Sequence, residues 1–210
     1  MVTPRLYTFS TDLPTARVAE LEGLLSPSEL ERAGRFHFEA DRLRFIASHG
    51  QLRTILGAQL SMSPGSIQFA HGIHGKPVVK GHPDDIAFTL SRSRDRCVVA
   101  VAHGREIGVD IEAVRPLDDA LQIARSRFTP VEANAIDSPE KFFRLWTRKE
   151  AVAKCLGWGL TLPFDVFEVD PGATDPEHLT VQYQGERSDI VLRKAVVEVE
   201  GFVGSLAQMR

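Results

Sequence analysis

The sequence predicts an α+β fold made of two similar halves, residues 1–104 and 105–210. In each half, helical segments are followed by strand-like segments, an order typical of α+β proteins. The length of 210 residues suits two halves of about 100 residues each. Apolar residues make up 43% and charged residues 25% of the chain. This ordinary globular usage excludes disorder, collagen and coiled coil as descriptions of the whole chain.

The first half is expected to open with a short strand at residues 5–9 and to continue with helices. Ser26 and Glu29 form a capping box with Pro27 in the first turn, so a helix begins there. Apolar residues at roughly helical spacing predict a second helix over residues 39–57. Runs rich in β-branched residues then predict strands at 67–70, 77–79, 86–90, 96–103 and, after the tight connection Gly104-Arg105, 106–112.

The second half repeats this order. Thr129 and Glu132, with Pro130 in the first turn, form a second capping box. Ser138 begins a longer helix, which Gly157 is placed to end. Strands are expected at 164–169, 179–184, 189–200 and 202–208, with a surface loop at 170–177.

Charge is distributed unevenly between the halves. Residues 1–105 hold 13 Lys and Arg against 10 Asp and Glu, a balance of +3, whereas residues 106–210 hold 12 against 18, a balance of −6. This asymmetry of charge is compatible with chance. It equally fits one site with phosphate-binding cations on one side and metal-binding carboxylates on the other.

Several classes of protein lose support. No apolar run approaches the roughly 18 residues of a membrane span, and the N-terminal residues lack the apolar core of a signal peptide. Cys97 and Cys155 make no disulfide framework, so a cytoplasmic setting is expected. Phosphate-loop, dinucleotide-binding and zinc-protease motifs are absent. A nucleic-acid partner is not expected, because acids interleave the arginines and favour a solvated helix face: Arg32, Arg35, Arg42, Arg44 and Arg53.

Asp110 and Glu112 stand two residues apart in an apolar strand and therefore point to the same face. Two carboxylates there are costly unless they are solvated, paired or bound to a metal. Mg²⁺ typically takes one or two carboxylates and completes its shell with water and substrate phosphates. A metal site and an exposed strand face are about equally compatible with this spacing.

Trp146, Glu150 and Lys154 lie along one stripe of the long helix of the second half. The ordinary interpretation is a surface ion pair beside a core tryptophan. A functional interpretation requires Glu150 to reach the same metal as Asp110 and Glu112, with Lys154 one turn away facing the phosphates of a substrate.

Two short motifs in the first half suit a phosphate. Gly75-Lys76-Pro77 combines close backbone approach with a point charge, although a hairpin corner has the same composition. Ser91-Arg92-Ser93 combines hydroxyls with a guanidinium at the end of a strand, although a polar turn would look alike.

Taken in order, these motifs resemble the signature of the 4′-phosphopantetheinyl transferases, in particular the surfactin-synthetase-activating (Sfp) type. The segments that carry the resemblance are LSPSELERAGRFHFEADRLR (25–44), GKP (75–77), FTLSRS (88–93), IGVDIE (107–112), RFTPVE (127–132) and LWTRKEAVAKCLGWGLTLP (145–163). Each motif is weak alone, but their order and spacing together are specific.

The resemblance implies the fold and the reaction. It implies an intramolecular pseudo-dimer, monomeric in solution, with the ligand in the cleft between a coenzyme A-binding half and a metal-binding, catalytic half. The enzyme would transfer 4′-phosphopantetheine from coenzyme A to a serine of an acyl or peptidyl carrier protein, with Mg²⁺, releasing adenosine 3′,5′-bisphosphate. The carrier would dock near residues 115–137.

The resemblance also implies site residues. The metal ligands would be Asp110, Glu112 and Glu150. The catalytic residues would be Glu150 as base, Lys154 on the pyrophosphate, and Asp110. The coenzyme A contacts would be Arg32, Arg35, Arg44, Lys76, Pro77, Ser91 and Arg92. Glu132 falls at a family acid whose role stays open.

One departure leaves alternatives open. The family usually has Ser-His-Ser where this chain has Ser91-Arg92-Ser93. A non-catalytic module that binds coenzyme A or the carrier is one alternative. A different metal-dependent phosphotransferase or phosphohydrolase that uses the same three acids is another.

Overall fold

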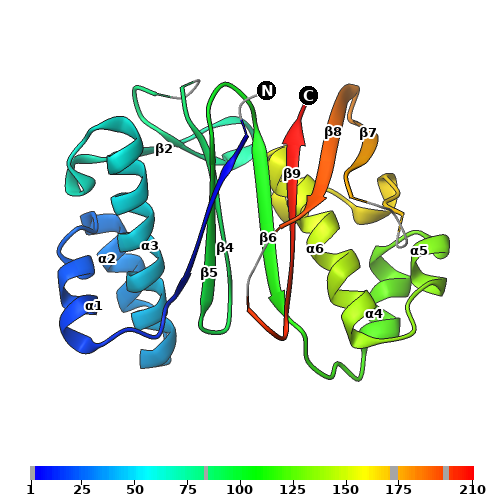
Figure 1. Cartoon of the computed structure of the whole chain (residues 1–210), viewed down its shortest axis with the longest axis horizontal. Helices are drawn as coiled ribbons and strands as arrows, with labels where there is room; N and C mark the ends of the chain where they lie inside the picture. The colour runs from blue at the N-terminus through cyan, green and yellow to red at the C-terminus, as the bar shows by residue number, and fades with distance from the viewer. Residues whose placement is uncertain (1–2, 83–84, 171–174, 196–198) are drawn as a thin grey trace.

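Two antiparallel sheets stand at the centre of the molecule, and helices cover the outer side of each (Figure 1). The computed structural model describes residues 3–82, 85–170, 175–195 and 199–210. It confirms the predicted mixed helix-and-sheet class: in the first half the strand Arg5–Ser10 comes first, then three α-helices, then the remaining strands. None of the described helices is long and apolar enough to cross a membrane.

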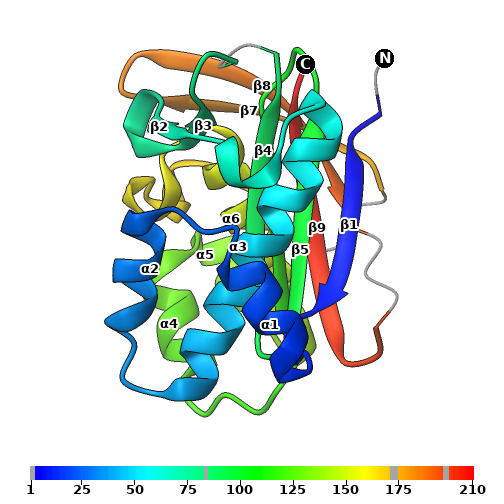
Figure 2. The same cartoon turned by 90° about the vertical axis from the view of Figure 1, so that its left-hand side faces the viewer.

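The first half has a three-stranded sheet in the order β1-β5-β4 and a separate β2-β3 hairpin. Figure 2 shows α1 and α3 in front of this sheet, covering its outer face. The bounds are β1 (Arg5–Ser10), α1 (Thr15–Glu22), α2 (Pro27–Gly34), α3 (Glu39–Leu60), η1 (Pro64–Ser66), β2 (Phe69–His71), η2 (Ile73–Gly75), β3 (Pro77–Val79), β4 (Ala87–Ser93) and β5 (Arg96–Ala102).

The second half has a four-stranded sheet in the order β6-β9-β8-β7. Helix α6 packs on β6 and β9, and α4 and α5 contribute to the same core. The bounds are β6 (Ile107–Ala113), α4 (Ala120–Arg127), α5 (Pro130–Asn134), α6 (Pro139–Cys155), η3 (Gly159–Thr161), η4 (Phe164–Val166), β7 (Glu177–Tyr183), β8 (Glu186–Lys194) and β9 (Phe202–Met209).

Strand β5 joins two cores, which explains its unbroken apolar sequence. Cys97, Val99 and Val101 pack in the cluster that α3 completes on the outer side. Val98 and Ala100 point the other way, into a cluster shared with the apolar face of β6. A strand buried on both faces has no polar alternation, because neither side meets water. The two sheets are therefore packed against each other through β5 and β6.

Most predicted elements are confirmed, with shifts of a few residues at their ends. Both capping boxes are present, at Ser26 with Glu29 and at Thr129 with Glu132. Helices α1 and α4 were not predicted. The predicted strand at 164–169 is wrong, because the segment forms the 3-10 turn η4 and offers backbone oxygens to Lys149 instead of to a neighbouring strand. Residues 171–174 and 196–198, within the predicted loop at 170–177 and strand at 189–200, lie outside the described residues.

Candidate active site

A glycine allows α6 to lie directly on β6. A Cβ added at Gly108 would collide with the backbone oxygen of Ala151 and the backbone nitrogen of Cys155. Only glycine permits this approach of helix and strand. The close contact brings the last two turns of α6, with Glu150 and Lys154, over the carboxylates of β6.

Asp110 is held at the centre of this contact. Its side chain is almost wholly buried, and its Oδ1 accepts hydrogen bonds from Lys154 Nζ at 2.7 Å and from Ser91 Oγ at 2.6 Å. Lys154 Nζ also donates to Ser91 Oγ at 3.1 Å. The other carboxylate oxygen, Oδ2, is buried and has no hydrogen-bond partner among the described residues.

Glu112 lies one strand repeat further along β6, nearer to solvent. Its Oε2 accepts a hydrogen bond from Ser93 Oγ at 2.6 Å and a longer one from Arg115 Nη1 at 3.4 Å. Both predicted acids of β6 are therefore partly satisfied by serines of β4. The exposed-strand alternative is excluded for Asp110, because only 4% of that residue is exposed.

Glu150 is the buried carboxyl group that the surrounding protein satisfies least. It makes no hydrogen bond or ion pair with any other described residue, and only 7% of it is exposed. Burial, reinforced by the negative charges of Asp110 and Glu112 and partly offset by Lys154, raises the pKa of Glu150 to about 7. The predicted Glu150–Lys154 surface pair is not formed. Trp146, by contrast, packs in the core as expected.

These three acids fit a magnesium ion by their chemistry. Among the described residues, no group of three or more His, Cys, Asp or Glu side chains is gathered as a ready metal site. The orphaned Asp110 Oδ2 and the raised pKa of Glu150 nevertheless mark a region with an excess of carboxylate oxygens. A hard cation bound there would relieve this excess, and oxygen ligands are those that Mg²⁺ prefers.

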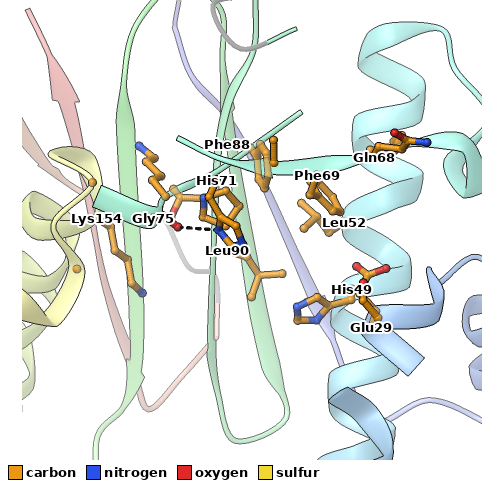
Figure 3. A pocket seen from close by; sticks show the side chains of 18 of the residues that line it. Glu29, His49, Leu52, Gln68, Phe69, His71, Gly75, Phe88, Leu90 and Lys154 are labelled. Carbon is orange, nitrogen blue, oxygen red and sulfur yellow. Dashed lines mark hydrogen bonds between the residues drawn. The ribbon is translucent and has the colours of Figure 1, made fainter. Parts of the chain in front are cut away.

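A cavity of about 880 Å³ extends from Lys154 into the first half (Figure 3). Figure 3 shows Lys154 on α6 at one end and Glu29 and His49, from α2 and α3, at the other. Its walls include residues of both halves, so it is a cleft between them. Four predicted site residues line it: Arg32, Lys76, Pro77 and Lys154.

Comparison with known proteins identifies the family. A model of the 4′-phosphopantetheinyl transferase superfamily matches residues 106–206, which include β6, α6 and all three acids. The 4′-phosphopantetheinyl transferase HetI of Nostoc sp. is 36% identical over 182 residues, covering 83% of this chain and 76% of that protein. The chain belongs to this superfamily of transferases. The 4′-phosphopantetheinyl transferase Sfp of Bacillus subtilis is 31% identical over 151 residues, 69% of this chain and 66% of the relative.

A more distant member is eukaryotic. The L-aminoadipate-semialdehyde dehydrogenase-phosphopantetheinyl transferase of Schizosaccharomyces pombe is 28% identical over 212 residues, 87% of this chain and 82% of that protein. The similarity to HetI and to this enzyme extends well beyond the residues that the superfamily model matches, so the first half of the chain shares it.

The predicted arginines of this phosphopantetheinyl transferase differ in position. Arg32 lines the cavity with its guanidinium carbon 5.2 Å from the centre of the Phe45 ring. Arg35 and Arg44 do not line it: Arg35 is exposed and paired with Glu31, and Arg44 is paired with Asp12. Of the three, Arg32 alone is placed to meet a ligand in the cavity.

Arg92 and Ser91 also lie outside the cavity lining, each for a different reason. The hydroxyl of Ser91 is committed to Asp110. The guanidinium of Arg92 is partly buried, and its Nη1 has no partner among the described residues. Burial lowers the pKa of Arg92; the positive charges of Arg44 and Arg32 act in the same direction, and nearby Cys97 and Asp41 oppose it. An unpartnered guanidinium beside two other arginines is suited to a polyanion.

Lys76 is already engaged by the other half of the chain. Its Nζ donates to the carboxylate of Glu106, to the backbone oxygen of Ile107 at 2.7 Å and to that of Cys155 at 3.4 Å. It thus ties β3 to the start of β6 and the end of α6. Beside it, the ring of His74 stacks on Trp158 at 3.3 Å between centroids. Lys76 and His74 both line the cavity, and both contact the second half of the chain.

Two buried ion pairs support the site, and sequence reasoning missed both. Arg53, predicted on a solvated face, is 1% exposed and donates to Glu29 at 2.7 and 2.8 Å. Lys149 and Glu132 form a fully buried pair at 2.7 Å, which gives Glu132 a structural role between α5 and α6. Glu29 and Glu132 could be singled out from the sequence because each belongs to a capping box. Their basic partners lie far away in the sequence and have no local pattern that predicts the ion pair.

Proposed function

We propose that this phosphopantetheinyl transferase moves 4′-phosphopantetheine from coenzyme A to a serine hydroxyl of an acyl or peptidyl carrier protein, with Mg²⁺, and releases adenosine 3′,5′-bisphosphate. The observation that carries the proposal is the convergence of Asp110, Glu150 and Lys154, of which Lys154 lines the cavity between the halves. Family membership supports the same reaction. We assign coenzyme A binding mainly to residues 1–104 and metal binding and catalysis to 105–210.

Glu150 is the proposed base. Its carboxylate is the group proposed to accept the proton of the carrier serine, directly or through a water molecule. Asp110, Glu112 and Glu150 would hold Mg²⁺, which when bound supplies positive charge to the pyrophosphate oxygens. Because the reaction is a phosphoryl-type displacement, positioning and charge neutralisation are its main requirements.

Lys154 is the proposed cation on the leaving side. Its ammonium group lines the cavity and is oriented by Asp110 Oδ1 and Ser91 Oγ, so it is fixed before substrate arrives. A preorganised cation stabilises developing negative charge without reorganisation during the reaction. Arg32 and the unpartnered Arg92 are the proposed contacts for the more distant phosphates of coenzyme A. Placing phosphate-binding arginines in the first half and carboxylates in the second matches the charge balance of +3 for residues 1–105 and −6 for residues 106–210.

The carrier is proposed to dock over residues 115–137, next to the acidic strand. Two large apolar side chains are exposed there, Leu121 on α4 at 49% and Val131 on α5 at 61%. The last turn of α4 adds Arg125 and Arg127. We propose that the enzyme acts as a cytoplasmic monomer.

The test is intact-mass measurement of transfer to a panel of carrier proteins, with and without Mg²⁺. Wild type should add the mass of phosphopantetheine, and Glu150→Gln and Asp110→Asn should lose most of this activity. Glu140→Gln is the matched control, because Glu140 lies on the same helix but is exposed and paired with Arg144. Unchanged transfer by both site variants would refute the site assignment.

The same assay separates the alternatives. Coenzyme A binding without transfer to any carrier would indicate a non-catalytic module, which the Ser91-Arg92-Ser93 departure keeps open. Release of inorganic phosphate from small nucleotides without carrier labelling would indicate a phosphohydrolase.

A further inference from the structure

Two serines of β4 face the two acids of β6 in matching register. Ser91 and Ser93 are two residues apart, as are Asp110 and Glu112, and each serine contacts one acid. Strands β4 and β6 belong to different sheets, so no backbone ladder joins them. The serine–acid contacts therefore cross the seam between the halves.

Each serine has the same pair of bonds. Ser91 Oγ donates to Asp110 Oδ1 at 2.6 Å and accepts the backbone N–H of Ile111 at 3.3 Å. Ser93 Oγ donates to Glu112 Oε2 at 2.6 Å and accepts the backbone N–H of Ala113 at 3.0 Å. Accepting the backbone N–H leaves the hydroxyl proton free for the carboxylate, so each donation has a defined direction.

The consequence is that one oxygen of each acid is fixed and the other is left available. Asp110 Oδ1 is occupied by Ser91 and Lys154, whereas Oδ2 is buried without a partner among the described residues. In Glu112, Ser93 and Arg115 occupy the same oxygen, Oε2. Hydrogen bonds of this kind orient metal-binding carboxylates in proteins.

We propose that Ser91 and Ser93 are positioning residues for the metal-binding carboxylates, so that the first half of the chain sets the metal affinity of acids in the second half. This inference rests on the proposed function. It gives Ser91 a role through Asp110 instead of, or in addition to, contact with coenzyme A.

A purely structural role for the serines makes a different prediction. If the hydroxyls only join the two strands, their removal lowers the melting temperature but leaves metal affinity unchanged in the protein that remains folded. If they orient the acids, metal affinity falls even well below the melting temperature. The two roles are therefore separable by a binding measurement.

The experiment is calorimetric titration of the full chain with Mg²⁺, alone and with coenzyme A present, but without carrier. Ser91→Ala and Ser93→Ala are each expected to weaken Mg²⁺ binding by about 10-fold or more, the usual effect of losing such a supporting bond. Ser205→Ala is the matched control, because Ser205 is a buried serine paired with Asp110 in the β6–β9 register, yet its hydroxyl contacts Thr147 and no acid. Its affinity should match that of wild type.

One further variant, together with the second serine, keeps the test decisive. Ser91→Thr retains the hydroxyl and should restore Mg²⁺ affinity. If Ser91→Ala fails to fold, Ser93→Ala gives the same answer at the more exposed acid, Glu112. Alanine variants that are folded and bind Mg²⁺ like wild type would overturn the proposal while leaving the transferase function intact. A wild type that neither binds Mg²⁺ nor transfers would refute the proposed function itself.

Discussion

Glu150→Gln should stabilise the metal-free protein at alkaline pH while it removes transferase activity. The wild-type carboxyl is buried near Asp110 and Glu112, and this raises its pKa from 4.5 to about 7. Above neutral pH the folded protein must hold an ionised, unpaired carboxylate. Glutamine has nearly the same shape but carries no charge, so it avoids that cost.

The size of the effect follows from the two pKa values. A group whose folded pKa is raised contributes its full stability below the unfolded pKa, and that contribution is lost as pH rises through the folded pKa. With values of 4.5 and about 7, the wild type loses on the order of 3 kcal/mol in all, of which roughly 2 to 3 kcal/mol falls between about pH 5 and pH 8. The glutamine variant loses none of this.

The assay is urea unfolding in EDTA at several pH values from about 5 to 8, monitored by circular dichroism. The free energy of unfolding of Glu150→Gln minus that of wild type should grow with pH, and Glu140→Gln should show no such trend. With Mg²⁺ added, wild type should gain stability and Glu150→Gln should gain less. A difference that is flat with pH, or that falls as pH rises, would refute the reasoning about this site.

Three other single substitutions and one double variant test neighbouring features. Lys76→Met should cost about 1 to 3 kcal/mol in thermal or urea unfolding, because Glu106 and two backbone oxygens lose their donor, and should raise KM for coenzyme A more than it changes kcat. Lys149→Met should cost about 3 to 5 kcal/mol by leaving Glu132 buried without a cation, and adding Glu132→Gln should recover part of that loss in the same measurement. Arg92→His should make coenzyme A binding weaken between about pH 6 and pH 8 in calorimetry, because imidazole loses its charge there and guanidinium does not.

The parts of the site that were predictable from sequence are those with a local period. Spacing of two on a strand placed Asp110 and Glu112 on one face, and spacing of four on a helix placed Glu150 and Lys154 on one stripe. The helix or strand and the direction of its side chains follow largely from the residues of that element itself, so both can be predicted from the local sequence. The local pattern did not determine the ion-pair partner of Lys154. Helical spacing favoured Glu150, whereas in the folded protein Lys154 pairs with Asp110.

Polar contacts between residues that are far apart in the sequence could not be predicted from local spacing. Arg53 stands in a helix beside other arginines, and its burial depends on Glu29, 24 residues away. Segment 164–169 has strand-like composition, but Lys149 draws its backbone oxygens into a buried network and prevents strand pairing. In both cases a long-range polar contact overrode a local preference, which short-range patterns do not describe.

The hydrogen bonds of the seam explain why a charged site lies between two otherwise apolar sheets. If β4 and β6 were joined by a backbone ladder, the N–H groups of Ile111 and Ala113 would bond to carbonyl oxygens and would not need the serine hydroxyls as acceptors. Here they bond to Ser91 and Ser93, whose own protons turn toward the acids. Interrupting the sheet therefore satisfies the backbone and at the same time provides donors for two carboxylates, one of them deeply buried. A hydroxyl that both joins the strands and orients an acid would make the packing of the two halves a condition for forming the proposed metal site.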